Sequence, residues 1–320
     1  MHKSVDVANY QINNGGAHGI CCQKVSEAEV FARNGIQDIL ITNQVTDILK
    51  IDRLTKIAKT NCNISCCVDN EENIINIQNL AFENNSIINV YIEYDCGAKR
   101  CGVDSFKEIQ KLIDLINTKS NIKFKGFQAY NGSIQHIENF SQRKINVQET
   151  CNKIRYLKTK FKDYSPIITG VGTGCFDLEV NENVYDEIQV GSYAFMDAHY
   201  SSLKKDNKLN NTIDFENALF VLSNVMSTAV KKQAVVDAGL KSMSLDSGLP
   251  TVFNYDLKYV NCSDEHGIIE DLENTLKIND KVFLIPGHCD PTCNLHDWYV
   301  VKKDDKVIDL WPVSARGFSY

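Results

Sequence analysis

Short apolar runs alternate with stretches of helical periodicity over about the first 200 residues of this 320-residue chain. Continuous apolar runs of this kind are typical of strands in a parallel sheet that is buried on both faces. Repeated strand–helix units of this length predict a TIM barrel. The predicted strands are residues 19–23, 38–42, 63–68, 88–94, 123–129, 166–169 and 187–190, and the predicted helices are residues 5–13, 26–34, 47–58, 71–83, 105–117 and 147–161.

The number of predicted strands is one short of a complete barrel. A closed barrel of this kind has eight strands, whereas this sequence shows seven and opens on a helix. We therefore expect that the first strand is missing from the front of the sequence and that the visible strands are the second to the eighth. The second helix opens on Ser26-Glu-Ala-Glu29, which has the form of a capping box.

The pattern changes from about residue 211 to strand-like runs joined by short turns, with no long amphipathic helix. It predicts a second, mainly antiparallel β domain. We place the boundary in the polar segment 201–211. This gives a domain of residues 1–205 with the predicted TIM barrel and a β domain of residues 206–320. The predicted strands of the β domain are residues 218–230, 233–237, 259–262, 281–285, 298–301 and 306–310.

Composition narrows the functional class. The net charge is −7 and the basic residues form no stripe, so nucleic acid is not an expected partner. No apolar run reaches the roughly 18 residues of a membrane span, and the opening residues do not read as a signal peptide. Adjacent cysteines among the twelve, such as Cys66 and Cys67, are interpreted as buried small hydrophobes in a reducing compartment. We therefore expect a cytoplasmic protein with no membrane partner.

The segment from Pro286 to Tyr299 carries the densest group of chemically useful side chains. Two strand-like runs flank it, so we predict two strands joined by a rigid polar loop. In strand-like backbone, residues i and i+2 point to the same side, so His288 and Asp290 can converge while Cys289 points away. An imidazole and a carboxylate suit Zn²⁺, Mn²⁺ or Mg²⁺ and leave coordination positions for water or substrate. The alternative is a polar hairpin whose histidine caps a turn.

Two glycine-containing loops follow the last two predicted barrel strands. The first is Thr169-Gly-Val-Gly172-Thr173-Gly174 and the second is Gly191-Ser192-Tyr193. Glycine lets backbone N–H groups approach an anion closely, and the loops after strands seven and eight of TIM barrels often bind a phosphate. The sequence therefore favours a phosphate site, with tight turns as the alternative explanation of the glycines.

Further polar residues follow the middle strands at the catalytic face. Arg100 comes just past the end of the predicted strand 88–94, where the alternative is a surface ion pair with Asp95 or Glu93. Gln128, Tyr130 and His136 follow the next strand. His136 is a candidate base, although a loop histidine can also serve only as a hydrogen-bonding residue.

Taken together, these motifs resemble the D-threonine aldolase/D-serine dehydratase family, whose members are fold-type III pyridoxal-phosphate (PLP) enzymes related in architecture to alanine racemase. The likeness rests on Pro286-Gly-His-Cys-Asp-Pro-Thr, on His296-Asp-Trp-Tyr, on Ala315-Arg-Gly317 and on Gly191-Ser-Tyr-Ala-Phe-Met-Asp. It covers essentially the whole chain and is strongest toward the β-hydroxyaspartate aldolases.

The resemblance implies an alanine-racemase-like barrel that binds pyridoxal 5′-phosphate and a divalent metal. It implies His288 and Asp290 as metal ligands, Arg100 near the cofactor ring, and Tyr130 and His136 in the substrate pocket. The fold relatives suggest a homodimer. The residues expected to bind the cofactor are Arg100, Gln128, Tyr130, Gly172, Thr173, Gly174, Gly191, Ser192 and Tyr193.

The start of the chain departs from the family pattern. In the family, the lysine that forms the Schiff base ends the first barrel strand in a stretch resembling His-x-Lys-x-His-Lys, whereas this chain begins Met1-His2-Lys3. The Schiff-base lysine is therefore expected just before Met1, with Lys3 matching the second lysine of the pattern. A truncated gene model, a part supplied by another chain and a decayed relative are the three explanations, of which we favour the first.

The resemblance implies a lyase that cleaves D-β-hydroxy amino acids of the 3-hydroxyaspartate or threonine type to glycine and an aldehyde. A D-serine dehydratase, which would give pyruvate and ammonia, is the first alternative. An inactive remnant that has lost its Schiff-base lysine is the second. Glu265-His-Gly267 is a further family-like stretch, whose only role suggested by the sequence is support of the metal loop.

Overall fold

The computed structural model describes residues 1–206 and 213–320, which form two compact units. The sheet unit comprises Ser4–Gln135, Gln142–Val190 and Gly317–Tyr320. The barrel unit comprises Met1–Lys3, His136–Ser141 and Gly191–Arg316. The predicted domain division at residues 205 and 206 stays a prediction, and part of the proposed boundary segment 201–211 lies outside the described residues.

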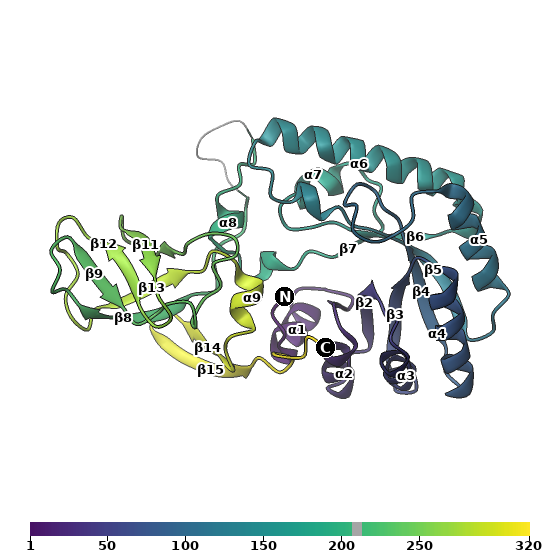
Figure 1. Ribbon diagram of the computed structural model, residues 1–320, viewed down its shortest axis with the longest axis horizontal. Coiled ribbons are helices and arrows are strands. Elements are labelled where there is room, and N and C mark those ends of the chain that lie inside the picture. The colour runs from purple at the N-terminus through teal and green to yellow at the C-terminus, as the bar shows by residue number, and fades with distance from the viewer. Residues whose placement is uncertain (207–212) are drawn as a thin grey trace. The chain divides into compact units, whose positions relative to one another are not determined.

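The sheet unit is built on one parallel sheet in which the strands follow one another in chain order (Figure 1). Helices α3, α4 and α5 lie along the outside of this sheet (Figure 1). The seven predicted strands are confirmed to within a few residues at each end. The strands are β1 (Ile20–Cys22), β2 (Asp38–Gln44), β3 (Asn63–Val68), β4 (Ile88–Glu93), β5 (Ile122–Ala129), β6 (Ile167–Gly170) and β7 (Glu187–Ile188).

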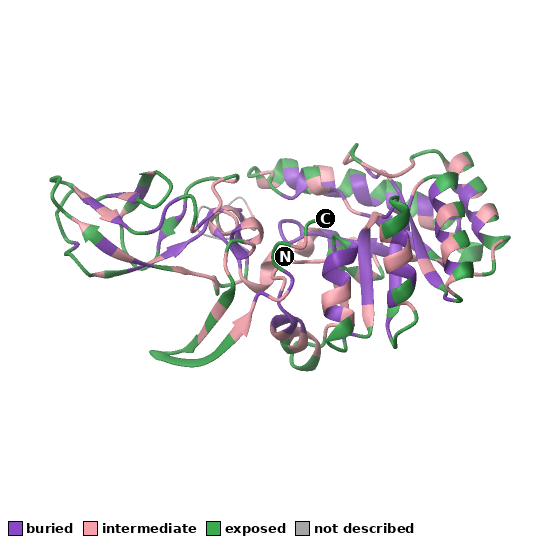
Figure 2. Cartoon of the chain, turned by 60° about the horizontal axis from the view of Figure 1, so that its bottom comes forward, coloured by how far each residue is buried: buried purple, intermediate pink, exposed green. Residues whose placement is uncertain are grey.

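The helices of the sheet unit pack an apolar stripe against the strands, as the burial colours of Figure 2 show. For example, Ile74 and Ile77 of α4 are fully buried. Ile109 and Ile113 of α5 are fully buried as well. Spacings of three and four residues place such side chains on one helix face. The helices are α1 (Val5–Asn13), α2 (Val25–Arg33), α3 (Ile48–Ile57), α4 (Glu71–Glu83), α5 (Phe106–Asn117), α6 (Phe140–Lys160) and α7 (Phe176–Asn181).

Side-chain caps fix the starts of three of these helices. Asp47, Asn70 and Ser105 each accept a hydrogen bond from the backbone N–H three residues later. The capping box predicted at Ser26 is wrong, because α2 begins one residue before it and its N-cap is Lys24. Glu27 instead accepts the N–H groups of Gln23 and Lys24. The Ser26 hydroxyl is buried and donates to the carbonyl oxygens of Phe318 and Tyr320.

The barrel unit contains a closed six-stranded antiparallel barrel of strand order β10-β11-β12-β9-β8-β13. Its core includes Val225, Val236, Ile269 and Leu284, which are fully buried. A separate hairpin of β14 and β15 follows (Figure 1). The strands are β8 (Val221–Ser227), β9 (Gln233–Val236), β10 (Thr251–Val252), β11 (Lys258–Cys262), β12 (Gly267–Glu270), β13 (Lys281–Ile285), β14 (Trp298–Lys303) and β15 (Lys306–Pro312).

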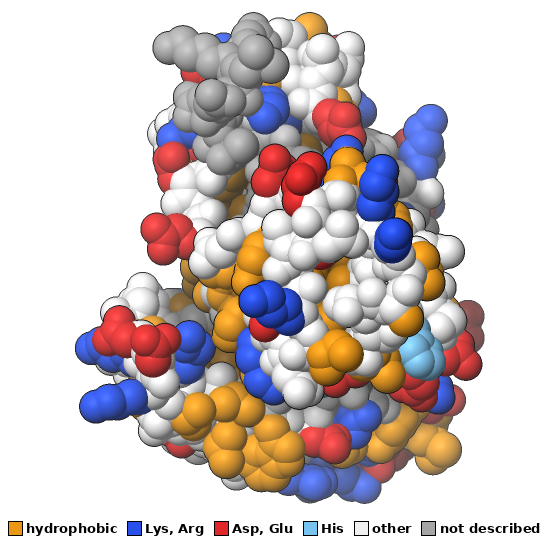
Figure 3. All heavy atoms as spheres, turned by 90° about the vertical axis from the view of Figure 1, so that its left-hand side faces the viewer, with side chains coloured by type: hydrophobic (Ala, Val, Ile, Leu, Met, Phe, Trp, Pro, Cys, Tyr) orange, Lys and Arg blue, Asp and Glu red, His pale blue; other side chains and the backbone are white. Residues whose placement is uncertain are grey.

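The hairpin β14–β15 exposes large apolar side chains, among them Trp298, Val300 and Leu310. On the face that Figure 3 presents, hydrophobic side chains form patches with charged and other polar groups between them. The predicted antiparallel β domain is confirmed, whereas the two short strands β10 and β12 were not predicted from the sequence. β10 contains one apolar residue, Val252, and β12 contains two, Ile268 and Ile269, so each apolar run is too short to predict a strand.

The loop between β13 and β14 contains a short helix. The prediction of strand-like backbone around His288 and Asp290 is therefore wrong. His288 is the N-cap of a short helix, α9 (Cys289–Cys293), with Asp290 in its first turn. Pro291 is tolerated there because the first N–H groups of a helix have no acceptor within the helix. None of the helices in the described residues is long and apolar enough to span a membrane.

Candidate active site

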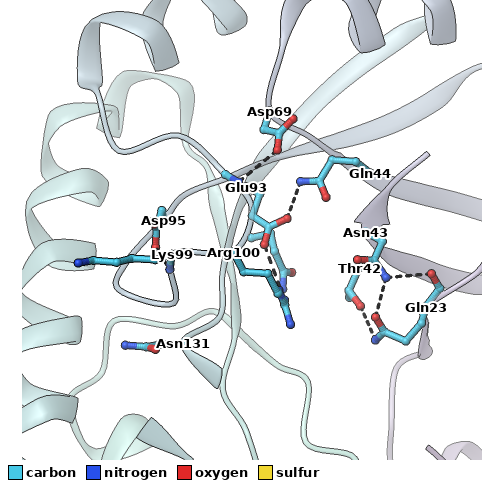
Figure 4. A network of polar contacts seen from close by, with 12 residues as sticks. Gln23, Thr42, Asn43, Gln44, Asp69, Glu93, Asp95, Lys99, Arg100 and Asn131 are labelled. Carbon is cyan, nitrogen blue, oxygen red and sulfur yellow. Dashed lines mark hydrogen bonds and ion pairs between the residues drawn. The ribbon is translucent and has the colours of Figure 1, made fainter. Parts of the chain in front are cut away.

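Polar side chains at the carboxyl ends of the first strands form a connected network in the sheet unit (Figure 4). Gln44, at the end of β2, donates from Nε2 to Glu93 Oε2 at 2.6 Å. Glu93 ends β4 and is buried, and its other carboxylate oxygen lies 4.0 Å from the Arg100 guanidinium. Burial raises the pKa of Glu93, against the opposing effects of Gln44 and Arg100.

The predicted cofactor residue Arg100 thus has the ion pair with Glu93 that the alternative interpretation proposed. It also lies over the ring of Tyr130, with 5.9 Å from the guanidinium carbon to the ring centroid. Its side chain remains more than half exposed. The structure therefore brings Arg100 and Tyr130 together and leaves the guanidinium accessible to an anionic or aromatic ligand.

Gln128, by contrast, is engaged inside the sheet unit. It is buried near the end of β5, and its Oε1 accepts a hydrogen bond from Gln189 Nε2 at 2.6 Å. Gln189 also donates to the Thr169 hydroxyl at 2.6 Å. Gln128 therefore ties the end of β5 to the neighbouring strands, and its role toward a cofactor stays a prediction.

The first glycine loop is pressed against Gln135. A Cβ at Gly172 would lie 2.4 Å from Gln135 Oε1, and a Cβ at Gly174 would lie 1.8 Å from the Gln135 carbonyl oxygen. Gln135 also accepts the N–H of Cys175 at 3.1 Å. The tight packing that was the alternative explanation of the glycines is thus present.

The same loop nevertheless has a donor to offer to a phosphate. Gly174 is buried, and no residue in the described part of the chain accepts a hydrogen bond from its N–H. A buried backbone N–H without an acceptor is rare, because leaving it unpaired is costly. Thr173 lies beside it and is also buried. This orphaned amide fits the phosphate of PLP, so the loop can serve both purposes.

A buried carboxylate that the sequence did not single out holds this loop in place. Glu179, in α7, accepts the N–H of Gly172 and the Nε2 of Gln135, each at 3.2 Å. Burial raises the pKa of Glu179 to about 7, although hydrogen bonds from Gln135, Gly172 and Tyr185 oppose the shift. The only sequence signal was an acidic residue on the short stretch after the glycines.

The raised pKa of Glu179 predicts a pH-dependent stability. The folded chain keeps this proton up to about pH 7, whereas the unfolded chain releases it near 4.5. The stabilisation is therefore complete below about pH 4.5 and is lost as the pH rises through 7, by about 3 kcal/mol in all. Glu179→Gln, which cannot ionise, should remove this slope between pH 5 and 8 in urea denaturation. Parallel pH profiles for the two proteins would contradict the assignment.

The second glycine loop belongs to the barrel unit. Gly191 precedes a single 3₁₀ turn, Ser192–Ala194, which includes Tyr193. The Ser192 carbonyl accepts the N–H groups of Phe195 and Met196. No described residue accepts a hydrogen bond from the N–H of Gly191 or of Ser192. These two amides are a second set of donors suited to a phosphate.

His136 lies in a cluster of aromatic side chains in the barrel unit. Its ring stacks on His199 with 4.4 Å between centroids, and its Nε2 lies 3.3 Å from the Tyr200 hydroxyl. Burial lowers the pKa of His136 to about 4, with further contributions from the charges of His199 and His288. The imidazole is therefore neutral at pH 7, which is the form that can accept a proton.

The helix that carries His199 is bonded to the predicted metal loop. In α8 (Ala198–Ser201), the N–H groups of Ala198 and His199 donate to the carbonyl oxygens of Pro286 and Gly287 at 2.9 and 3.3 Å. Asp197, fully buried, accepts the N–H of Cys289 at 2.9 Å. Three hydrogen bonds thus fix the loop from Pro286 to Cys289 against the segment that follows the second glycine loop.

The two predicted metal ligands have donor atoms that are not engaged by the protein. His288 Nδ1 lies 2.7 Å from Asp246 Oδ2, while its Nε2 has no hydrogen-bond partner among the described residues. The Asp290 carboxylate likewise receives no hydrogen bond from residues 1–206 or 213–320. An imidazole nitrogen and a carboxylate are suitable donors for Zn²⁺ or Mn²⁺. No group of three or more such ligands occurs in the described residues, so other ligands would be water or substrate.

The predicted site residues are divided between the two units. Arg100 and Tyr130 meet in the sheet unit, where Gln128, Gly172, Thr173 and Gly174 also lie. His136, Gly191, Ser192, Tyr193, His288 and Asp290 belong to the barrel unit. Sequence reasoning considered Glu93 only as an alternative ion-pair partner of Arg100. It missed Glu179 and also Asp246, for which the sequence gives no signal.

Comparison with known proteins shows the family of this chain. Residues 1–199 match the model of the alanine racemase N-terminal domain, and residues 218–302 match that of a putative serine dehydratase domain. The chain is 46% identical to 3-hydroxy-D-aspartate aldolase of Paracoccus denitrificans (strain Pd 1222), over all of this chain and 84% of that protein. The chain belongs to the family of the D-β-hydroxy amino acid aldolases. The alanine racemase domain places this aldolase family among the fold-type III PLP enzymes.

Two further similar proteins are D-threonine aldolases. The D-threonine aldolase of an Arthrobacter species is 38% identical, over 99% of this chain and 84% of its own length. The crystal structure of D-threonine aldolase from Filomicrobium marinum superposes with a TM-score of 0.93 at 34% identity, covering 100% of this chain and 86% of that one. The fold and family expected from the sequence are therefore confirmed.

Proposed function

We propose that this chain is a PLP- and divalent-metal-dependent aldolase that cleaves a D-β-hydroxy amino acid, of the 3-hydroxyaspartate or threonine type, to glycine and an aldehyde. The observation that carries the proposal is the pair of unengaged donors, His288 Nε2 and the Asp290 carboxylate, in a chain 46% identical to an aldolase. One imidazole and one carboxylate leave most of a metal's coordination sphere to the substrate hydroxyl and water.

Each of the candidate site residues has a proposed role in binding or catalysis that suits its chemistry. In the sheet unit, the Gly174 amide would donate to the cofactor phosphate, and Arg100 with Tyr130 would contact the cofactor ring. In the barrel unit, the amides of Gly191 and Ser192 are further candidate donors to a phosphate. When bound, PLP supplies the electron sink for breaking the Cα–Cβ bond. His288 and Asp290 would hold the metal that acidifies the β-hydroxyl. Neutral His136 would accept the hydroxyl proton at its free nitrogen, directly or through water.

Product analysis tests this proposal against its alternatives. The purified chain is supplied with PLP and Mn²⁺ and incubated separately with D-3-hydroxyaspartate, D-threonine and D-serine. We expect glycine with glyoxylate from the first or glycine with acetaldehyde from the second. Pyruvate and ammonia from D-serine would instead assign a dehydratase, as the second domain's resemblance suggests. Bound Mn²⁺ without turnover of any of the three, in a protein that includes the lysine expected before Met1, would assign a non-catalytic remnant.

Compartment and assembly are part of the proposal. All twelve cysteines are free thiols within the described residues, which supports a reducing, cytoplasmic compartment. A homodimer is proposed from the fold relatives, and light scattering of the purified chain measures its mass directly.

A further inference from the structure

We infer that Asp246 is a positioning residue for the metal site: it holds the His288 imidazole in the tautomer and orientation that present Nε2 to a divalent cation. The inference rests on the proposed function, in which His288 is a metal ligand. Asp246 lies outside every motif that the sequence singled out. Its carboxylate contacts the ring nitrogen on the far side from the free Nε2.

The contact between Asp246 and His288 is short and specific. Asp246 Oδ2 lies 2.7 Å from His288 Nδ1, and the Ser247 hydroxyl lies 3.3 Å from the same nitrogen. Since a carboxylate can only accept, Nδ1 must carry the proton in this pair. A neutral imidazole has one proton, so Nε2 is left with its lone pair.

The Asp246 carboxylate is itself held by neighbouring hydroxyl groups. Ser244 Oγ donates to Asp246 Oδ1 at 2.7 Å, and Ser247 Oγ donates to Oδ2 at 2.9 Å. These bonds fix the carboxylate although nearly half of its side chain is exposed. An unsupported surface ion pair would have little directional effect, whereas a carboxylate held at both oxygens can orient its partner.

The segment that carries Asp246 is bonded to the metal loop at two further points. Thr292, in α9, accepts the N–H of Ser244 at 3.2 Å and donates its hydroxyl proton to the His288 carbonyl at 2.7 Å. His296 Nε2 lies 2.8 Å from the Ser242 carbonyl oxygen. The segment 242–247 therefore follows the loop from His288 to His296, and Asp246 has a fixed place beside His288.

This arrangement has the chemistry of a carboxylate–histidine–metal unit. A carboxylate on the far nitrogen fixes the histidine tautomer, raises the basicity of the coordinating nitrogen and restricts rotation of the ring. Loss of such a partner typically weakens metal affinity 10–100-fold while leaving the ligand itself in place. The expected phenotype of an Asp246 variant is therefore weaker metal binding by an otherwise folded protein.

The test uses the full chain and two measurements. First, the tautomer of His288 in the metal-free protein is read from two-dimensional ¹H–¹⁵N spectra of ¹⁵N-histidine-labelled protein, with the His288 signals assigned by their absence in His288→Gln. We expect a proton on Nδ1 in the wild type and a mixture of tautomers in Asp246→Ala. A proton on Nε2 in the wild type would overturn the inference, whatever the variant does.

Second, Mn²⁺ binding is measured by electron paramagnetic resonance of the free ion. Asp246→Ala should raise the dissociation constant about 10–100-fold, and Asp256→Ala, which removes an exposed carboxylate elsewhere in the barrel unit, should change it less than about twofold. Unchanged affinity in folded Asp246→Ala refutes the positioning role. If the wild type binds no Mn²⁺, the metal part of the proposed function fails, and the tautomer measurement still decides the role of Asp246.

Discussion

Replacing His288 with alanine is expected to weaken Mn²⁺ binding more than about 100-fold, beyond the range typical of an outer partner. His288 supplies one of only two protein donors proposed for the metal, and its Nε2 has no competing partner among the described residues. A site with two protein donors cannot compensate for the loss of one. Titration of the variant with Mn²⁺ by electron paramagnetic resonance measures the effect without relying on catalytic turnover.

The matched control is His266→Ala, which removes another histidine of the same unit. His266 is exposed in the turn between β11 and β12, where its Nδ1 lies 3.5 Å from the Ser263 hydroxyl. Its replacement should leave the Mn²⁺ affinity as in the wild type. Equal affinities for wild type, His288→Ala and His266→Ala would show that the metal, if bound, is held elsewhere.

The second large effect is expected for Gly174→Ala, which should lower the free energy of unfolding by about 2–3 kcal/mol and weaken PLP binding. The added Cβ would lie 1.8 Å from the carbonyl oxygen of Gln135, and main chain cannot give way as a flexible side chain can. The loop must shift away from Gln135, which moves the Gly172 amide off Glu179. Urea denaturation and a fluorescence titration with PLP measure the two consequences.

The control for this substitution is Gly191, a predicted phosphate glycine of the second loop. A Cβ at Gly191 would meet only Met1 Cβ, at an ordinary contact distance of 3.5 Å, and the φ of Gly191 is −114°. Gly191→Ala should therefore change the unfolding free energy by less than about 1 kcal/mol. If Gly174→Ala proves as stable as Gly191→Ala, the packing against Gln135 does not constrain the loop.

Local sequence signals predicted most of the secondary structure. Helices such as α1 and α4 and strands such as β3 and β13 begin and end where their apolar patterns do, because periodicity and capping act over a few neighbouring residues. The errors occur where a distant part of the chain intervenes. Ser26 has the residue type of an N-cap, yet its hydroxyl bonds to Phe318 and Tyr320, nearly 300 residues away.

The candidate site was predicted only in part for the same reason. His288 and Asp290 stand out because two metal-binding residue types occur within three positions. Glu265-His-Gly267 attracted attention as support for the metal loop, but Glu265 pairs with Lys241 and His266 lies near Ser263. The residue that contacts His288 is Asp246, 42 positions earlier, in a stretch whose composition resembles any polar loop.

The sequence by itself determined the family, the parallel βα order, the antiparallel second domain and the residue types that carry the chemistry. Those properties depend on hydrophobic periodicity and on short motifs, which are local. Only the tertiary structure decided that Gln135 packs against Gly172 and Gly174, that Glu179 is buried on the Gly172 amide, and that Asp246 contacts Nδ1 of His288. These contacts join residues that are distant along the chain, and their energies depend on burial and on hydrogen-bond geometry, which a residue acquires only when the chain folds around it.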